Sequence, residues 1–146
     1  IQAAKNLGVG VHAFETTADY AQNYVQGGRI LIKHQAVALR LADMATRIEA
    51  VRALLDRAAQ AVDDNAPEAE VLCNMAKLFA SEEIIKVAQH AVELHGGNGT
   101  MLDFGIEKSL RDAVIFLHMD ATTDISKFKI VKNMFPDTAG KYAGPE

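Results

Sequence analysis

The chain has 146 residues, a length that suits one domain with its own buried core. Apolar residues make up 49% of it, so it can fold rather than remain disordered. The net charge of -4 argues against nucleic acids and anionic membrane surfaces as partners, and no apolar run approaches a membrane span. We therefore expect one domain over residues 1–146, with neither nucleic acid nor membrane as a partner.

The single cysteine, Cys73, excludes an intrachain disulfide framework. It lies among Val71, Leu72 and Met75, where a buried and inert thiol is the usual interpretation. No signal peptide is visible, so a reducing, cytoplasmic compartment fits the sequence. The chain opens on Ile1 without an initiator Met or a capping residue, which looks like the start of a segment cut from a longer protein.

The first helical pattern begins within a few residues of the start and is predicted to end at Gly27-Gly28. Its apolar residues recur at alternating steps of four and three, which places them on one face of a helix. They are Leu7, Val11, Phe14, Ala18, Ala21 and Val25.

The second pattern is the clearest in the chain. Its apolar residues keep a heptad-like spacing, which predicts a long helix packed at a shallow angle in a bundle. They are Val37, Leu41, Met44, Ile48, Val51, Leu55, Ala58 and Val62. The charged residues of its other faces are expected to form a solvated surface or subunit contacts; they are Arg40, Asp43, Arg47, Glu49 and Arg52. The helix is predicted to stop at residues 63–65.

A third helix is predicted to begin after Asn65, which can cap it, with Pro67 in its first turn. Gly96 suits a left-handed residue at its C-terminal end. The apolar stripe of this helix consists of Val71, Met75, Leu78, Ile85, Ala88 and Val92. Two more helices are predicted, near residues 106–118 and 124–134, with Pro136 ending the last one.

These elements predict an all-α fold, namely an up-down four-helix bundle with a short extra C-terminal helix. The five histidines form no pair at i, i+4 and have no cysteine partner at ligand spacing. We therefore expect no metal site.

The most specific patterns of the chain are a glycine-rich turn and the helix that follows it. Residues 93–99 read E-L-H-G-G-N-G, and residues 106–113 read I-E-K-S-L-R-D-A. Together with Q-A-V at 35–37 and L-A-D-M-A at 41–45, they resemble the C-terminal helical domain of the acyl-CoA dehydrogenases. These are flavoenzymes that desaturate acyl-CoA thioesters. The resemblance covers residues 7–131 in one register, and it implies that an N-terminal helical domain and a middle β-domain lie upstream.

The glycine turn has two interpretations. A glycine-rich turn most often marks a helix end that needs positive φ, and no βαβ unit surrounds this one. The resemblance implies instead that Gly96, Gly97 and Gly99 present bare backbone to the adenosine part of FAD bound by a neighbouring subunit. It also implies a cofactor-binding role for Glu93, where the family usually has a Gln that hydrogen-bonds the flavin nucleotide. FAD is therefore the expected cofactor of the full protein.

Residues 119–125 read M-D-A-T-T-D-I and are similar to a family segment of the form Y-E-G-T-x-x-I. The resemblance implies that Asp120 is the catalytic base, which removes the α-proton of the thioester. Aspartate keeps the carboxylate but is one methylene shorter than the family's glutamate. Thr122 matches a flavin-contacting Thr, and Asp124 replaces a residue that is often Gln or Glu, so both are candidate cofactor-binding residues. For Asp120 and Asp124 the alternative role is to N-cap the last helix.

The segment ahead of the second helix departs from the family. There the family usually reads R-x-x-F-G; the Arg pairs with the FAD pyrophosphate across the subunit interface, and the Phe packs on the flavin. This chain has Tyr24, Val25, Gln26, Gly27 and Gly28 instead, so both residues are replaced. Losing a phosphate-pairing Arg removes a charge-assisted contact.

The resemblance leaves three functions open. The first is an FAD-dependent acyl-CoA dehydrogenase that forms a trans-2-enoyl-CoA, with Asp120 or a carboxylate upstream of Ile1 as base and an electron-transferring flavoprotein as acceptor. The second is a non-catalytic partner in a mixed tetramer, because the departures cluster on flavin-facing motifs. The third is a helical assembly module only. We expect a homo- or hetero-oligomer, and we expect this chain alone to be helical and without dehydrogenase activity.

Overall fold

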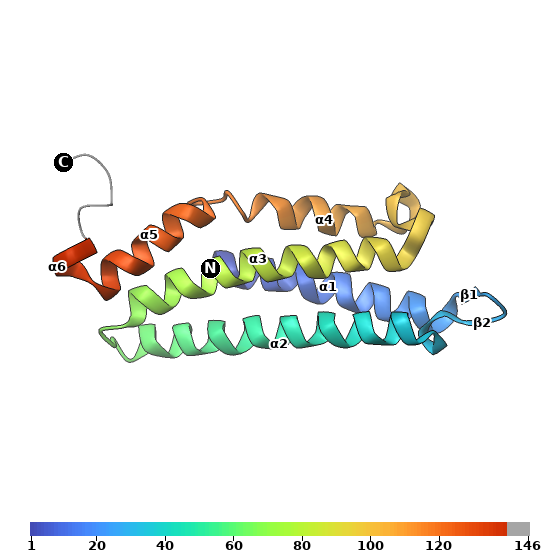
Figure 1. Cartoon of the computed structure of the whole chain (residues 1–146), viewed down its shortest axis with the longest axis horizontal. Coiled ribbons are helices and arrows are strands. Elements are labelled where there is room, and N and C mark those ends of the chain that lie inside the picture. Colours follow the sequence, from blue (N-terminus) through green and yellow to red (C-terminus); the bar gives the residue numbers. More distant parts are fainter. Residues whose placement is uncertain (140–146) are drawn as a thin grey trace.

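The computed structural model describes residues 1–139 as a bundle of long helices (Figure 1). The helices are α1 (Gln2–Asn23), α2 (Gln35–Asp63), α3 (Ala69–His95), α4 (Ile106–Ile115), α5 (Thr123–Met134) and α6 (Pro136–Ala139). Consecutive helices from α1 to α4 run in alternating directions, and α5 continues along the bundle from the end of α4 (Figure 1). The all-α up-down bundle with an extra C-terminal helix is confirmed.

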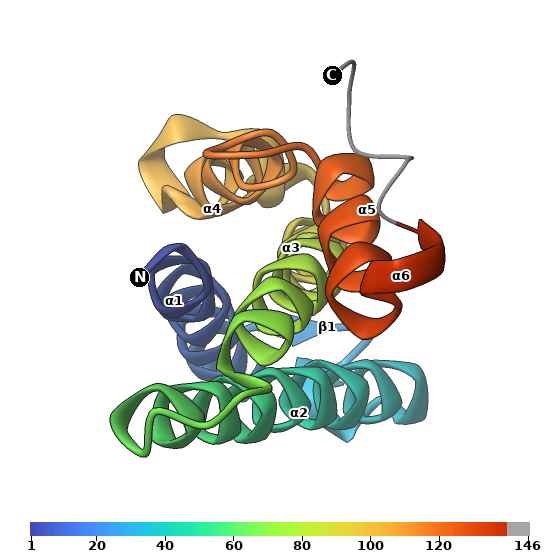
Figure 2. The same cartoon turned by 90° about the vertical axis from the view of Figure 1, so that its left-hand side faces the viewer.

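Helix α3 lies in the middle of the bundle and contacts α1, α2, α4 and α5 (Figure 2). Its buried residues therefore occur on more than one side, and they are Leu72, Ala76, Ala80, Ser81, Ile84, Val87, Ala88, Ala91 and His95. Of the predicted stripe only Ala88 is buried; the other five members are half-buried. The predicted stripe was wrong because a helix with neighbours on several sides has no single apolar face to detect.

Helix α2 matches its prediction closely because only one of its faces meets the core. Six of the eight predicted stripe residues are buried, while Leu55 is half-buried and Val62, at the end of the helix, is 50% exposed. Helix α2 ends at Asp63, as predicted. Cys73 is exposed rather than buried, so the interpretation of an enclosed thiol was wrong.

Helix α1 ends four residues before the glycine pair that was predicted to stop it. The chain leaves the helix at Tyr24 and forms a short antiparallel hairpin, in which β1 (Val25–Gln26) pairs with β2 (Arg29–Ile30). Gly27 and Gly28 make its turn with φ of 59° and 77°, a region that favours glycine. Val25 is consequently in a strand and 59% exposed, not on the helical stripe.

Small residues allow α1 to approach α3 closely. A Cβ added at Gly10 would lie 2.5 Å from Cδ1 of Ile84, which is shorter than any normal contact. Nearby, the buried Asn6 donates a hydrogen bond of 2.9 Å from Nδ2 to the carbonyl oxygen of Ala80. The two helices are thus fixed by a steric match and a buried polar contact.

Three predicted helix ends need correction. Asn65 does not cap α3; it adopts φ of 51° in the turn, and α3 begins later, at Ala69. Gly96 has positive φ, 58°, but its ψ of −134° lies outside the left-handed helical region. Pro136 begins α6, since α5 already ends at Met134. None of the helices in residues 1–139 is long and apolar enough to cross a membrane.

Candidate functional site

The candidate site residues fall into two separate places. Glu93 and the three glycines lie where α3 ends, which we call the turn end (residues 93–105 with the β1–β2 hairpin). Asp120, Thr122 and Asp124 lie on and just after the α4–α5 loop (residues 116–122). Helix α4 runs between these two places, so the structure does not bring them together (Figure 1).

At the turn end, the three glycines have different surroundings. Gly96 and Gly97 are exposed, and a Cβ at either position would meet no atom within 4 Å. Gly99 is buried, and a Cβ there would lie 2.2 Å from the backbone oxygen of Val92. Gly99 is therefore needed for packing of the turn against α3, while Gly96 and Gly97 leave open backbone that a ligand can approach.

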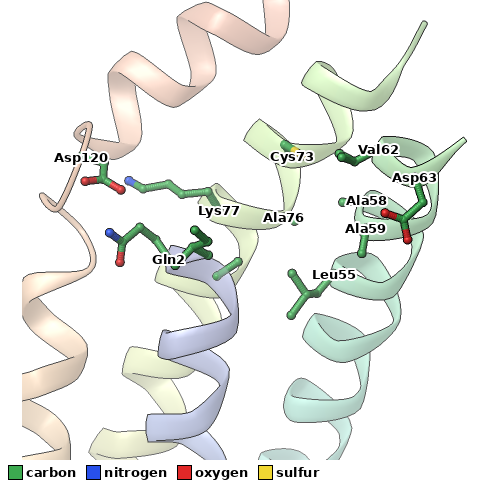
Figure 3. Close-up of a pocket in the computed structure, with 12 residues that line it drawn as sticks. Gln2, Leu55, Ala58, Ala59, Val62, Asp63, Cys73, Ala76, Lys77 and Asp120 are labelled. Atoms are coloured by element: carbon green, nitrogen blue, oxygen red, sulfur yellow. The ribbon is translucent and has the colours of Figure 1, made fainter. Parts of the chain in front are cut away.

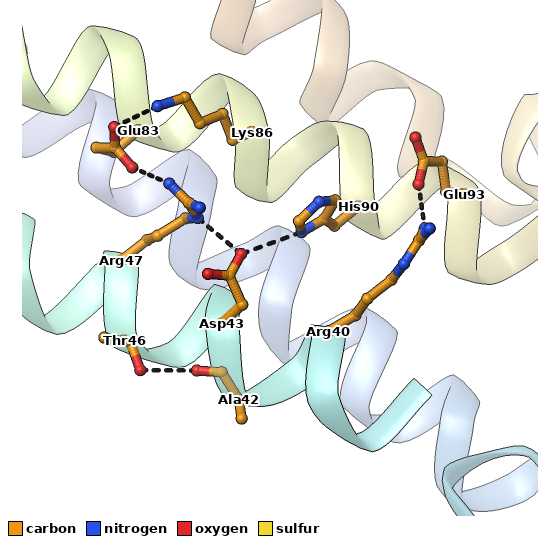
Figure 4. A network of polar contacts seen from close by, with 9 residues as sticks. All are labelled: Arg40, Ala42, Asp43, Thr46, Arg47, Glu83, Lys86, His90 and Glu93. Carbon is orange, nitrogen blue, oxygen red and sulfur yellow. Dashed lines mark hydrogen bonds and ion pairs between the residues drawn. The ribbon is translucent and has the colours of Figure 1, made fainter. Parts of the chain in front are cut away.

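Glu93 forms an ion pair with Arg40 of α2 across the surface of the bundle (Figure 4). Both side chains are about half exposed, at 53% and 45%. The carboxylate can only accept hydrogen bonds, unlike the amide of the family's Gln, and here a guanidinium of the same chain already occupies it. Glu93 is therefore engaged within its own domain.

A separate polar network joins α2 and α3 further along these helices (Figure 4). Arg47 bridges Asp43, at 2.8 Å, and Glu83, and the ring Nδ1 of His90 lies 3.5 Å from Asp43. The hydrogen bond from Arg47 holds the pKa of Asp43 below its ordinary value. Part of the charged surface predicted for α2 is thus a set of ion pairs within the chain, and Asp43 has a structural role.

Four rings form a cluster at the turn end. Tyr20 stacks on Tyr24 with ring centroids 4.7 Å apart and on His95 at 4.1 Å, and Phe104 meets Tyr20 edge-on at 6.1 Å. Asn98 donates a hydrogen bond of 2.9 Å to the Tyr20 hydroxyl. Burial lowers the pKa of His95, so its ring is disposed to be neutral. The cluster lines a groove of about 380 Å³.

Sequence reasoning missed this cluster because its members come from separate elements. No local spacing links Tyr20 in α1 to His95 at the end of α3 or to Phe104 after the turn. The consequence for the hairpin is direct: Tyr24, at the position of the family's phosphate-pairing Arg, packs onto its own domain. Arg29 lies on the other strand, and its guanidinium contacts His34 Nδ1 at 3.3 Å.

The α4–α5 loop presents Asp120 as an exposed carboxylate with φ of 64°. Figure 3 shows this carboxylate facing the end of the Lys77 side chain of α3. The ammonium of Lys77 donates a hydrogen bond to the backbone oxygen of Ala121. Burial lowers the pKa of Lys77, and the nearby negative charge of Asp120 opposes this effect. Sequence reasoning missed Lys77, since a lone lysine in a helix has no distinguishing spacing.

The cap of α5 is Thr122 rather than either aspartate. Its Oγ1 accepts a hydrogen bond of 3.3 Å from the backbone N–H of Ile125. Asp124 stands in the first turn with its side chain 81% exposed, 3.8 Å from the ammonium of Lys127. The N-capping alternative for Asp120 and Asp124 was therefore wrong, because neither carboxylate caps α5.

A pocket of about 460 Å³ lies between α1, α2 and α3 and is bounded at one end by Asp120 and Lys77 (Figure 3). Its remaining wall is mostly apolar and consists of Ile1, Ala3, Leu55, Ala58, Ala59, Val62 and Ala76, with Gln2, Asp63 and Cys73. A carboxylate at the edge of an apolar pocket can accept a proton from an acidic C–H group of a bound ligand.

Within residues 1–139, no cluster of three or more His, Cys, Asp or Glu side chains could hold a metal ion. The backbone of Gly96 and Gly97 is open, since an added Cβ would meet no atom within 4 Å, and this is compatible with the approach of a flavin nucleotide. Glu93 and Tyr24, in contrast, already have partners in their own domain.

Comparison with known proteins identifies the family. The model of the acyl-CoA dehydrogenase C-terminal domain matches residues 1–135. An acyl-CoA dehydrogenase of Bacillus subtilis (strain 168) is 38% identical over 136 residues, which are 93% of this chain and 36% of that protein.

Solved structures agree with this result. Butyryl-CoA dehydrogenase from Megasphaera elsdenii matches with a TM-score of 0.88 at 30% identity, covering 92% of this chain and 35% of that one. The FAD complex of PigA matches with a TM-score of 0.85 at 29% identity, covering 90% of this chain and 34% of that one. The chain spans roughly a third of the length of these relatives. It therefore belongs to the acyl-CoA dehydrogenase family, whose C-terminal helical domain it matches over nearly its whole length.

Proposed function

We propose that the whole protein is an FAD-dependent acyl-CoA dehydrogenase that oxidises the Cα–Cβ bond of an acyl-CoA to a trans-2-enoyl-CoA. The observation that carries this proposal is the exposed Asp120 carboxylate beside an apolar pocket, at the position of the family's base. Asp120 would take the α-proton of the thioester. FAD, when bound, would supply the acceptor for the β-hydrogen as hydride.

The other candidate residues would hold the cofactor. The Oγ1 of Thr122 accepts from Ile125 N–H, so its own hydroxyl hydrogen remains available for donation to the flavin. Asp124 stands in the same first turn of α5. Gly96 and Gly97 would receive the nucleotide of a neighbouring subunit, which is supported by the separation of the turn end from the α4–α5 loop in one chain.

A neighbouring subunit requires an oligomer, and α5 supports one. Apolar residues along α5 are about half exposed, namely Ile125, Phe128, Val131 and Met134. A row of exposed apolar side chains on one short helix is typical of a covered surface. An electron-transferring flavoprotein as electron acceptor remains a prediction from the resemblance, and a cytoplasmic location remains a prediction from the single cysteine.

A non-catalytic partner subunit is the second candidate, and one observation favours it. Two of the three positions that depart from the family in this region have partners within the chain, since Tyr24 stacks on Tyr20 and Glu93 pairs with Arg40. The third is Gly27, which replaces the family's Phe. A subunit that no longer contacts flavin would carry such internal contacts.

Flavin content separates the two candidates. The full-length protein is purified alone and together with any neighbouring paralogue, and FAD is measured per chain by absorbance after release. The dehydrogenase predicts close to one FAD per chain in the protein purified alone. Little flavin alone, rising to a fractional share in a mixed complex, would establish the partner subunit instead. An upstream sequence without a middle β-domain would leave only the assembly module.

A further inference from the structure

The α4–α5 loop is tied to α3 by several contacts from three neighbouring residues. The Oγ of Ser81, which is buried, donates to the backbone oxygen of Phe116 at 2.9 Å. Lys77, one turn earlier on α3, donates from Nζ to the backbone oxygen of Ala121. Glu82 pairs with Lys127 of α5 at 3.2 Å. These contacts therefore reach the start of the loop, its end and the helix that follows. The contact of Lys77 lies beside Asp120, the residue of the loop with the least common backbone conformation.

That residue is Asp120, whose φ of 64° lies in the left-handed region. Non-glycine residues rarely adopt this conformation, and they keep it only where surrounding contacts hold the backbone. Asp120 is exposed, so core packing does not hold it. Its two neighbours in the chain are held instead: Met119 donates its backbone N–H to the carbonyl oxygen of Ile115 at 2.9 Å, and the carbonyl oxygen of Ala121 accepts from Lys77. Of these two contacts, only that of Lys77 comes from a side chain of α3.

We propose that Lys77 is a positioning residue for Asp120: its ammonium holds the Ala121 carbonyl and faces the Asp120 carboxylate, which fixes the direction of that carboxylate at the pocket edge. This inference rests on the proposed function, in which Asp120 is the base. Lys77 acts through the loop and contacts no reacting atom itself.

The surroundings of Lys77 suit a fixed rather than a mobile ammonium. The residue is half-buried, and dehydration lowers the pKa of its amino group. The charged groups that act on it are Asp120 from the loop and Lys129 from α5. The negative charge of Asp120 favours the protonated amine of Lys77.

The test compares three variants of the full-length protein. Lys77→Met removes the charge and the donor but keeps the apolar stem, and Lys77→Arg keeps both. Lys129→Met is the matched control, because it removes one exposed positive charge from the same neighbourhood without a loop contact. Hydrogen–deuterium exchange of peptides that cover residues 116–124 reports on the loop without any need for activity.

We expect Lys77→Met to speed exchange in the loop by about tenfold or more, while Lys77→Arg and Lys129→Met stay near wild type. In the flavin-loaded enzyme, Lys77→Met should lower kcat on the order of a hundredfold with little change in KM, and Lys77→Arg should restore most of it. Unchanged loop exchange in Lys77→Met overturns the proposal, as does faster exchange with an unchanged kcat.

The failure of the proposed function would look different. In that case the wild-type protein itself would lack flavin or turnover, while loop exchange would still show whether Lys77 holds Asp120 in place. A Lys77→Arg variant as mobile as Lys77→Met would also overturn the proposal, because both donor and charge are present in arginine.

Discussion

The turn end and the α4–α5 loop carry the two halves of the family motif, but they are built in opposite ways. At the turn end Tyr24 stacks on Tyr20, Glu93 is paired with Arg40 and Gly99 is packed against α3, so only Gly96 and Gly97 of the glycine turn remain open. On the α4–α5 loop the carboxylate of Asp120 is exposed, and side chains of α3 donate hydrogen bonds to the backbone of the loop.

This difference shows which departures from the family have structural compensation. A replaced residue that gains a new partner stabilises its own domain, and its side chain is then no longer available to bind a ligand. An exposed carboxylate in an uncommon backbone conformation does not stabilise its domain in this way, and such a residue is typical of a functional position. This contrast supports the proposal that the loop carries the chemistry and the prediction that the flavin contacts of the turn end are weakened.

The largest expected effect tests the loop. Asp120→Asn in the full-length protein should lower turnover of an acyl-CoA by about 10²- to 10⁴-fold, because the amide cannot accept the proton. Asp120→Glu should raise turnover if reach limits the reaction. Steady-state oxidation with an artificial electron acceptor measures both.

Asp56→Asn is the control for these two variants, since it also removes an exposed carboxylate but lies on α2, outside both the loop and the turn end. Its turnover should remain near wild type. Full activity in Asp120→Asn would place the base elsewhere in the protein and remove the contrast between the two regions.

The next effect concerns the glycines of the turn end. Gly99→Ala should destabilise the chain by about 3 kcal/mol, because its Cβ would collide with the Val92 backbone, which cannot move aside like a side chain. Gly97→Ala is the matched control and should change the free energy of unfolding by less than about 0.5 kcal/mol. Urea unfolding of both variants, followed by circular dichroism, measures this difference. Equal free energies of unfolding would argue against a packing role for Gly99.

A smaller effect tests the altered flavin contacts. The double variant Tyr24→Arg with Glu93→Gln restores the family residues and should tighten FAD binding roughly tenfold, because a charge-assisted hydrogen bond contributes about 1.5–3 kcal/mol and the lost stacking offsets part of it. Titration of the flavin-depleted full-length protein with FAD gives the dissociation constants. Tyr24→Leu, which loses the stacking without adding a cation, should not tighten binding. If it does so equally, the cation is not the cause.

The smallest effect is the pH dependence of the ring cluster. Burial lowers the pKa of His95 below its ordinary value of 6.5. Between these two pKa values, His95 is protonated in the unfolded chain and neutral in the folded chain. The resulting stability is fully present above about pH 6.5 and is lost as the pH falls through the folded-state pKa. His95→Gln should flatten the difference in unfolding free energy between pH 7.5 and 5.5. The exposed His12→Gln should leave it unchanged, and a similar flattening there would count against His95.

The sequence allowed prediction of those parts whose signal is local. Helix α2 has one buried face, so the heptad-like spacing of Val37 to Ala58 identified its core residues. Helix α3 has neighbours on several sides, and its stripe could not be found from spacing alone. The hairpin after Asn23 was missed because two-residue strands carry no periodic signal, and the glycine pair reads equally well as a helix stop.

The candidate site divides in the same way. Asp120 and Thr122 could be placed on the connection before the last helix, because their segment has a family pattern. Lys77, Ser81 and Tyr20 could not, since each acquires its role only when a distant segment is brought against it. The cap of α5 shows the limit even at short range: three neighbouring residues could cap it, and backbone geometry selected Thr122.

The central position of α3 has a consequence for how the domain folds. Lys77 and Ser81 support the loop from its first half, and Glu93 and His95 form part of the turn end at its last turn. Neither region can be structured unless α3 is, and α3 depends on all four helices around it. The domain should therefore unfold as a single cooperative unit, in which the turn end and the α4–α5 loop lose their structure together.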